Sequence, residues 1–141
     1  MDGSEREAMV AVALAHAAAE ADRDIEATMG TLDDDPVYEL QPMGRMLRGR
    51  DSARAYYEHF FAECQPRISD YELRSEWITD EGVLQEYTLQ IAGGDGTTSR
   101  HAIIGILTFG TGGKLSGERI YASDDLLRLM FGPVLDQAAP L

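Results

Sequence analysis

Residues Arg100–Asp124 constrain the fold more than any other stretch, because they have the pattern of a long β-hairpin. An apolar run, HAIIGILTF, is followed by Gly-Thr-Gly-Gly and then by a second strand-like segment, KLSGERIY. Glycine adopts the positive φ angles that hairpin loops require, and the β-branched and aromatic residues on either side suit a pleated sheet. The stretch therefore predicts two long antiparallel strands.

The pairing of these two strands decides which side chains share a face. If Phe109 pairs with Lys114, the period-2 alternation of a strand puts six residues on one face. They are His101, Ile103, Gly105, Glu118, Ile120 and Ala122. Two ionisable groups beside apolar side chains are typical of a pocket wall, although the same residues would also suit a solvent-exposed face. A slip of one residue would separate Glu118 from His101.

Two more strands come before this hairpin, at residues 71–79 and 83–91. Pairing Ile91 with Thr98 predicts that Trp77, Glu86 and Thr88 join the face just described. The opposite face then carries Val83, Tyr87, Leu89, Ile91, Ala102, Ile104, Ile106 and Thr108. Both faces are substantially apolar, so we expect helices to cover one and a second copy of the chain to cover the other, giving a homodimer through the outer sheet face.

The N-terminal part is predicted to be helical. Residues 4–21 are rich in alanine, with Ser4 as the expected N-cap and Glu7 at capping-box spacing. The helical segment bends near residues 22–24 and ends before LDDDP at residues 32–36. His16 lies either inside or on a partly exposed helix face. The row that continues from it at successive i+4 spacing, Glu20, Asp24 and Thr28, is interpreted first as a solvated helix face and second as a polar wall.

The middle of the chain adds a short strand and an aromatic helix. Residues 37–47 predict a strand interrupted near Pro42-Met43-Gly44, and a helix follows that is capped at Asp51 or Ser52. Its stripe of Ala53, Tyr56, Tyr57, Phe60 and Phe61 is expected in the core. The turn-rich tail, residues 132–141, is expected to be disordered or to reach across a dimer.

Composition limits the classes of function. Twelve basic against 25 acidic residues give a formal charge of −13, which disfavours nucleic acid and anionic membranes as partners. Cys64 is the only cysteine, so an intrachain disulfide and a thiolate metal cluster are excluded. The acidic start and the Ala-rich segment after it match neither a signal peptide nor a membrane span. We expect one cytoplasmic domain, 1–141, with its core at about 8–131.

Three segments resemble the nuclear transport factor 2-like superfamily, in its SnoaL-like branch. They are ADRDIEATMGTLDDDPVYEL (21–40), GRMLRGRDSARAYYEHFF (44–61) and LTFGTGGKLSGERIYASDDLL (107–127). The resemblance implies an α+β fold in which a curved antiparallel sheet wraps around N-terminal helices as a cone, a cystatin-like α+β roll. This superfamily includes polyketide cyclases, limonene-epoxide hydrolases and ketosteroid isomerases, together with non-catalytic binders, so it specifies the fold better than the reaction.

Alignment with the ketosteroid isomerases is informative where it fails. Their oxyanion tyrosine falls on His16, their general-base aspartate on Leu40 and their protonated aspartate on Gly105, while their supporting tyrosine is matched by Tyr57. Because Leu40 cannot act as a base, the chain is not a ketosteroid isomerase. The resemblance does imply that the His101 face of the hairpin looks into the cone and that His16 points inward.

We therefore expect a mostly apolar cavity that binds a small apolar molecule. The expected catalytic residues are His101, Glu118, Glu86 and His16, and the expected binding residues are Tyr57, Trp77, Leu32, Leu40, Ile103, Gly105 and Ile120. A His–carboxylate pair can move a proton without a metal or other cofactor. His16 and Tyr57 would polarise a carbonyl or epoxide oxygen.

Two functions follow from this cavity. The first is a cofactor-independent cyclase, isomerase or hydrolase that uses His–carboxylate acid–base chemistry. The alternative is a non-catalytic small-ligand-binding or dimerisation domain of the same fold, in which the histidines are satisfied core residues. No P-loop, dinucleotide fingerprint or zinc-ligand spacing occurs in the chain.

Overall fold

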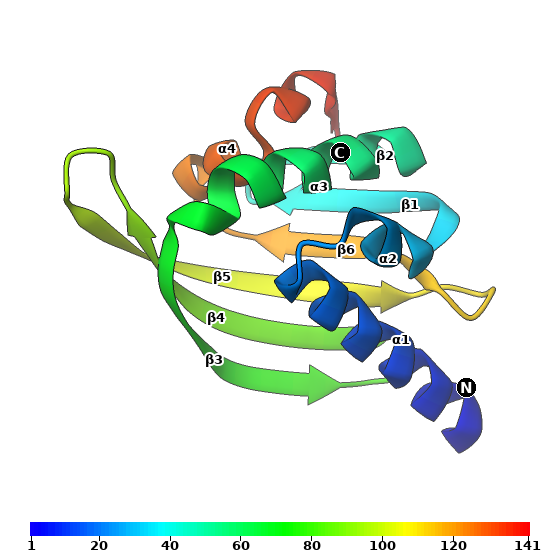
Figure 1. Cartoon of the computed structure of the whole chain (residues 1–141). Coiled ribbons are helices and arrows are strands. Elements are labelled where there is room, and N and C mark those ends of the chain that lie inside the picture. The colour runs from blue at the N-terminus through cyan, green and yellow to red at the C-terminus, as the bar shows by residue number, and fades with distance from the viewer.

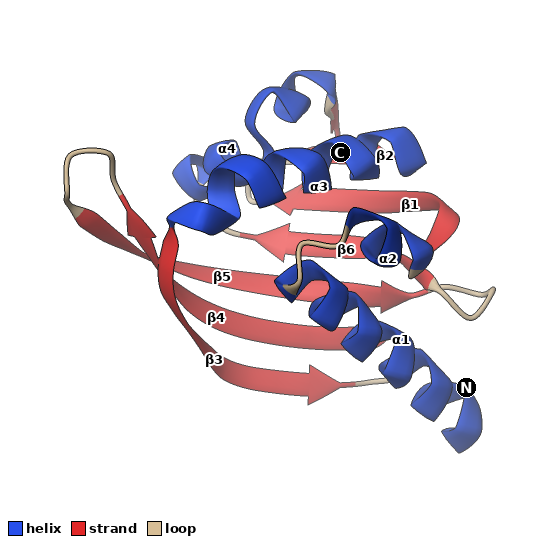
Figure 2. Ribbon diagram, viewed as in Figure 1, coloured by secondary structure: helices blue, strands red, loops and turns tan.

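A curved, unclosed sheet of seven strands is covered on one face by helices (Figures 1 and 2). The computed structural model describes all 141 residues. The helices are α1 (Gly3–Ala21), α2 (Ile25–Gly30), α3 (Arg50–His59) and α4 (Asp124–Phe131). The strands are β1 (Leu32–Gln41), β2 (Arg45–Arg48), β3 (Ile68–Ile78), β4 (Gly82–Ala92), β5 (Thr98–Phe109), β6 (Leu115–Tyr121) and β7 (Ala139–Pro140). The predicted α+β fold class is confirmed.

The strand order is β3-β4-β5-β6-β1-β2-β7. Every neighbouring pair is antiparallel except β1 with β6, which run parallel. The helices and the inner face of the sheet enclose one core of 25 buried apolar residues. Burial of this apolar surface is the main force that holds the helices on the sheet. No helix is long and apolar enough to cross a membrane.

The N-cap of the N-terminal helix lies two residues before the predicted cap, Ser4. Asp2 is the N-cap: its side chain accepts from the Glu5 backbone N–H, and the Glu5 side chain accepts from the Asp2 backbone N–H, which completes a capping box. The expected cap at Ser4 is therefore wrong. The predicted break at residues 22–24 is confirmed, and the Asp24 side chain caps α2 by accepting from Ala27 N–H.

The aromatic helix continues beyond its regular part. A π-helical turn (Phe60–Cys64) and a 3₁₀ turn (Gln65–Arg67) follow α3 and lead into β3. The N-cap is Gly49 rather than Asp51 or Ser52, and no side chain caps this end. The predicted interruption at residues 42–44 is confirmed as the turn between β1 and β2.

The β5–β6 hairpin keeps its predicted faces although its register differs by two residues. Phe109 pairs with Leu115 instead of Lys114, and a bulge then pairs Thr108 with Gly117, so that Leu107 rather than Gly105 lies opposite Glu118. The pairing of Phe109 and the bulge each shift the register by one residue. Two such shifts return every side chain to its predicted face, because strand side chains alternate with period 2. Gly117 is required at the bulge because its φ is +138° and a Cβ there would overlap the Val37 backbone.

The β4–β5 pairing differs by one residue, and this exchanges the faces of β4. Ile91 pairs with Ser99 rather than Thr98, so Tyr87 lies opposite Ile103 and Leu89 opposite His101. The inner face of β4 thus carries Gln85, Tyr87 and Leu89. The predicted inward positions of Glu86 and Thr88 are wrong, as is the outward position of Val83, Tyr87, Leu89 and Ile91.

Trp77 is also on the outer face. It pairs with Leu84 beyond a bulge in β3 between Leu73 and Ser75, and it is 54% exposed. A bulge inserts one residue and so changes the side to which the following residues point. The expected dimer through the outer face, where Trp77 and Tyr121 are exposed, stays a prediction.

The C-terminal segment is ordered against the same domain. Residues Gly132–Gln137 form a 3₁₀ helix, and β7 pairs with β2 through Met46 with Ala139 and Arg45 with Pro140. The expectation of a disordered or swapped tail is therefore wrong. The amphipathic helix α4, which is not among the helices predicted from the sequence, contributes Leu126, Leu127 and Phe131 to the core.

Candidate functional site

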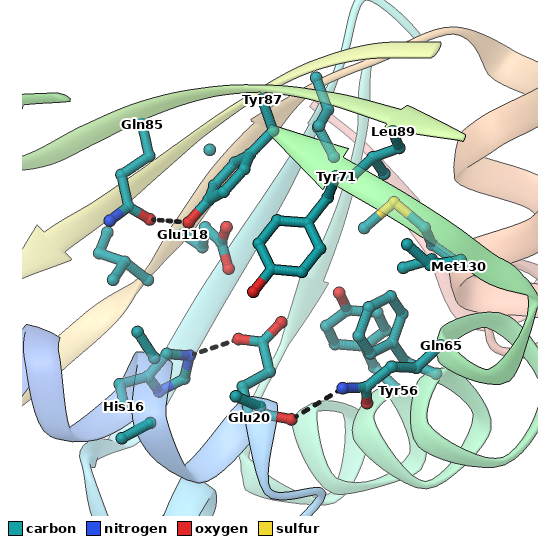
Figure 3. A pocket seen from close by; sticks show the side chains of 18 residues that line it. His16, Glu20, Tyr56, Gln65, Tyr71, Gln85, Tyr87, Leu89, Glu118 and Met130 are labelled. Carbon is teal, nitrogen blue, oxygen red and sulfur yellow. Dashed lines mark hydrogen bonds and ion pairs between the residues drawn. The ribbon is translucent and has the colours of Figure 1, made fainter. Parts of the chain in front are cut away.

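A cavity of about 520 Å³ lies between α1, the α3–π-helical segment and the inner face of strands β3 to β6 (Figure 3). Eighteen residues line it, and twelve of them are hydrophobic. The other six are His16, Glu20, Gln65, Gln85, Gly105 and Glu118. A mainly apolar cavity with a few convergent polar groups has the usual form of a small-molecule site.

The hydrogen bonds of His16 fix its tautomer. The Thr31 hydroxyl donates its single proton to the Thr28 carbonyl oxygen at 2.7 Å, so it can only accept from His16 Nδ1, which is also 2.7 Å away. Nδ1 is therefore the donor in this hydrogen bond, and Nε2 is the ring atom that faces the other partners. The ring is 1% exposed.

Nε2 of His16 faces two partners. Glu20 Oε2 lies 3.3 Å away, one helical turn further along α1, and the Tyr57 hydroxyl lies 3.1 Å away. When His16 is neutral, Nε2 accepts from Tyr57; when His16 is protonated, Nε2 donates to the Glu20 carboxylate. The Tyr57 hydroxyl is itself 2.6 Å from that of Tyr38, so a buried chain of hydroxyls supports the imidazole.

Glu20 connects His16 to the cavity. Its side chain is 30% exposed, and Figure 3 shows the carboxyl group extending from α1 towards the space below Tyr71. Its backbone carbonyl accepts from the Gln65 side-chain amide at 3.2 Å. The interpretation of Glu20 as part of a solvated helix face is therefore wrong. Asp24 and Thr28 do not join it, because Asp24 caps α2 and Thr28 is fully buried.

Glu118 provides the second carboxyl group of the cavity. It projects from β6 over Gly105, where a Cβ would lie 2.7 Å from Glu118 Oε1. Burial, followed by repulsion from Glu20, raises the pKa of Glu118 from 4.5 to about 8. The raised pKa favours the neutral acid form of Glu118, which can donate a hydrogen bond, while Glu20 is the carboxyl group paired with His16.

The tyrosines of the site remain protonated. Burial raises the pKa values of Tyr38, Tyr56 and Tyr57 well above 10, and burial likewise raises the pKa of Tyr87. The Tyr87 hydroxyl donates to Gln85 Oε1 at 3.2 Å, and its ring meets the exposed Tyr71 edge-on, with centroids 6.3 Å apart. These side chains therefore act as neutral donors and aromatic surface.

Only part of the predicted site lines this cavity. His16, Ile103, Gly105 and Glu118 do so. Tyr57, Leu32, Leu40 and Ile120 are instead buried in the surrounding core, with Tyr57 reaching the cavity only through His16. Glu86 and Trp77 belong to the outer sheet face.

The structure does not bring His101 and Glu118 together. His101 pairs with Leu89 near the β4–β5 loop, whereas Glu118 pairs with Leu107, six residues further along β5. Six residues of a strand span about 20 Å. His101 Nε2 instead lies 2.8 Å from the Ser99 hydroxyl. The expected His101–Glu118 acid–base pair is therefore wrong: the predicted pairing already separates the two residues by four positions along β5, and the shift in the β5–β6 register increases this to six.

Sequence reasoning missed several lining residues. Glu20 is four residues after His16, a spacing that places two side chains on one helix face. Tyr56, Gln65, Tyr71, Gln85 and Tyr87 also line the cavity. The β4 residues would follow from the correct register, whereas nothing in the helical pattern separates Tyr56 from Tyr57. No group of three or more His, Cys, Asp or Glu residues is placed to hold a metal ion.

Comparison with known proteins agrees with this arrangement. The sequence profile of the SnoaL-like domain matches residues 13–117, which is most of the chain. This chain belongs to the SnoaL-like domain family. The family lies within the nuclear transport factor 2-like superfamily, as the resemblance implies. Among curated proteins, no sequence matches significantly.

Solved structures share the SnoaL-like fold at low sequence identity. An NTF2-like protein of unknown function from Burkholderia xenovorans is 24% identical, with a TM-score of 0.64 over 86% of this chain and 88% of its own. A "putative isomerase" from Bacillus subtilis is 16% identical, with a TM-score of 0.66 over 94% and 96%. A "putative ketosteroid isomerase" from Kribbella flavida is 16% identical, with a TM-score of 0.65 over 84% and 79%. At these identities the likeness shows the fold alone.

Proposed function

We propose that this protein is a cofactor-independent enzyme that moves a proton on a small, mainly apolar carbonyl compound, as an isomerase or cyclase does. The observation that carries the proposal is that two carboxyl groups, those of Glu20 and Glu118, line one mainly apolar cavity. Glu20 is paired with the His16 imidazole, and Glu118 has its pKa raised to about 8 by burial and by Glu20. Two carboxyl groups whose surroundings favour different protonation states can serve as one base and one acid.

The roles of Glu20 and Glu118 follow from which group can accept a proton and which can donate one. The Glu20 carboxylate, backed by His16, takes a proton from the carbon beside the carbonyl group. The C–H electron pair becomes the C=C bond of an enol, and the carbonyl π electrons move to oxygen, which receives a hydrogen bond or the proton from Glu118. Return of the proton to another carbon gives isomerisation, and attack of the enol carbon on a second carbonyl gives cyclisation.

The lining also indicates the charge of the substrate. It contains no lysine or arginine, and its two carboxyl groups already repel each other. An anionic substrate would lose its hydration without gaining a cationic partner. We therefore expect a neutral molecule that is predominantly apolar, in keeping with the twelve hydrophobic lining residues.

Deuterium exchange at an activated carbon tests the chemistry without knowledge of the natural substrate. The probe is 2-tetralone, whose C1 protons exchange through an enol, followed by NMR in D₂O with and without protein. We expect the wild-type protein to accelerate exchange over buffer. Glu20→Gln and Glu118→Gln should each remove at least about 10²-fold of that acceleration, the usual contribution of a general acid or base.

A matched control and a clear negative result complete the test. Glu58→Gln changes an exposed carboxyl group on α3 and should leave the exchange rate unchanged. If 2-tetralone binds but exchanges at the buffer rate, the protein is the non-catalytic binder of the alternative hypothesis. Equal rates for Glu118→Gln and wild type would remove Glu118 from the mechanism.

A further inference from the structure

Tyr56 carries a hydroxyl group that has no hydrogen-bond partner in the protein. The residue is 2% exposed and lines the cavity. Its oxygen is not among the fully enclosed unpaired atoms of the chain, which are Gln65 Oε1 and Arg119 Nε, so it is open to the cavity. Figure 3 shows this hydroxyl pointing into the cavity. A hydroxyl that faces the cavity and bonds to no protein group is available to donate to a bound acceptor.

Packing prevents Tyr56 from turning to another partner. Its ring stacks on Phe131, with centroids 3.9 Å apart and 13° between the planes, and it also meets Phe60 at 5.7 Å. On the other side it contacts the ring of Tyr57 at 4.7 Å. The hydroxyl is therefore held in one direction, which is the property of a preorganised binding group.

The other tyrosine hydroxyls around the cavity are already hydrogen-bonded, except that of Tyr71, which is 66% exposed. Tyr38 and Tyr57 bond to each other and to His16, and Tyr87 donates to Gln85. Burial is the main cause that raises the pKa of Tyr56, with smaller contributions from the charges of Glu20 and Glu118. Tyr56 is thus a neutral donor in the same cavity as the proposed base, Glu20, and the proposed acid, Glu118.

We propose that Tyr56 is a ligand-binding residue whose hydroxyl donates a hydrogen bond to the carbonyl oxygen that Glu118 also faces. This rests on the proposed function for the identity of the ligand as a carbonyl compound, but it makes a separate claim. The site then prefers a ligand with an acceptor oxygen over an equally large hydrocarbon, and Tyr56 is the source of that preference.

A matched pair of probes isolates this hydrogen bond. 2-Tetralone and tetralin share a bicyclic frame and differ by the carbonyl group. We expect the wild-type protein to bind 2-tetralone more tightly, as measured by NMR titration. Tyr56→Phe should weaken the binding of 2-tetralone about three- to tenfold, which is the range for one hydrogen bond. The affinity for tetralin should stay within about twofold of the wild-type value. Circular dichroism and the melting temperature check that the variant folds.

The control removes a different hydroxyl from the same cavity wall. Tyr87→Phe deletes a hydroxyl whose proton goes to Gln85, so it should change the two affinities by the same factor. A second readout needs no variant: the carbonyl ¹³C resonance of labelled 2-tetralone should move downfield on binding to the wild-type protein. In Tyr56→Phe this movement should be smaller.

Four results would overturn the proposal: equal weakening of both probes in Tyr56→Phe, no weakening of either, no wild-type preference for 2-tetralone, or no downfield shift. These outcomes are separable from failure of the proposed function. If Tyr56→Phe loses the preference for the carbonyl compound but the wild-type protein catalyses no deuterium exchange, the proposed enzymatic function is wrong and the binding role of Tyr56 stands. Exchange that depends on Glu20 and Glu118 without a Tyr56 effect on binding would do the reverse.

Discussion

The Glu118 carboxyl group of β6 occupies the space that a side chain at Gly105 of β5 would fill, since a Cβ there would lie 2.7 Å from Glu118 Oε1. In the ketosteroid isomerase comparison, position 105 corresponds to a protonated aspartate. Here the acid reaches the same region from the neighbouring strand, and the glycine makes room for it. The absence of a side chain at Gly105 therefore leaves room for the Glu118 carboxyl group in the cavity.

Gly105→Ala should disturb the site more than the fold. Gly105 has no positive φ, and the added methyl group meets only the end of a flexible side chain, so we expect the melting temperature to change by a few degrees at most. The displaced carboxyl group should lower the rate of 2-tetralone exchange by about tenfold or more, because small misplacements of catalytic groups are costly. Gly94→Ala, with open space around it, is the control. Unchanged exchange in Gly105→Ala would show that the position of Glu118 is unimportant.

Glu118→Gln should make the protein more stable at alkaline pH. The folded-state pKa of Glu118, about 8, is above the unfolded value of 4.5, so the folded state binds more protons between these values and loses stability as pH rises through them. Glutamine does not titrate. The gain in unfolding free energy should be small at pH 4.5 and on the order of a few kcal/mol above pH 8. Urea unfolding across this range measures it, and a gain independent of pH would contradict the prediction.

Thr31→Val should release the tautomer of His16. The variant removes the acceptor of the Nδ1 proton and leaves a buried donor unpaired, at a cost of about 1–3 kcal/mol of unfolding free energy. ¹⁵N NMR should show Nδ1–H in the wild-type protein and a mixture of ring states in the variant, with slower probe exchange. Thr111→Val, in the exposed β5–β6 loop, controls for the substitution itself. Identical ¹⁵N spectra for Thr31→Val and wild type would refute the role of Thr31.

Gly132→Ala should destabilise the junction between α3 and α4. A Cβ at Gly132 would overlap the His59 ring, and its φ of +54° disfavours residues with a side chain. The His59 ring is held there because Nε2 donates to the Leu129 carbonyl at 3.0 Å. We expect a loss of about 2 kcal/mol or more. In a double-mutant cycle with His59→Ala, part of that loss should disappear. Full additivity would mean that the overlap is not its cause.

The sequence predicts the faces of β5 and β6 but not those of β4. Alternation and glycine-rich turns identify the strands, and two one-residue irregularities at residues 109–117 cancel in the side-chain pattern. The single-residue difference in the β4–β5 loop does not cancel, so Glu86 and Tyr87 exchange places. Loop length in glycine-rich turns is set by local backbone geometry, which residue patterns define only to within a residue or two.

For the helical residues of the site, sequence-based prediction is limited in a different way. His16 is correctly placed inside by the family resemblance, and Glu20 follows from it at i+4. Tyr56 and Tyr57 are adjacent on one aromatic stripe, and both are almost fully buried. Their different partners, Phe131 for one and His16 for the other, depend on how α4 and α1 pack. Tertiary packing of that kind leaves no trace in the spacing of the residues along α3.

The ionisation of Glu118 tests the central claim most directly. The protein is labelled with ¹³C at the glutamate carboxyl groups and studied by NMR. The resonance that is missing from the spectrum of Glu118→Gln is that of Glu118, and it is then followed in the wild-type protein from pH 4 to pH 10. A neutral acid facing Glu20 across an apolar cavity should titrate near pH 8, and its midpoint should fall in Glu20→Gln, because a repelling charge is removed. A Glu118 resonance that titrates below pH 5 would mean that both carboxyl groups are ionised at neutral pH, and the proposed division into acid and base would be wrong.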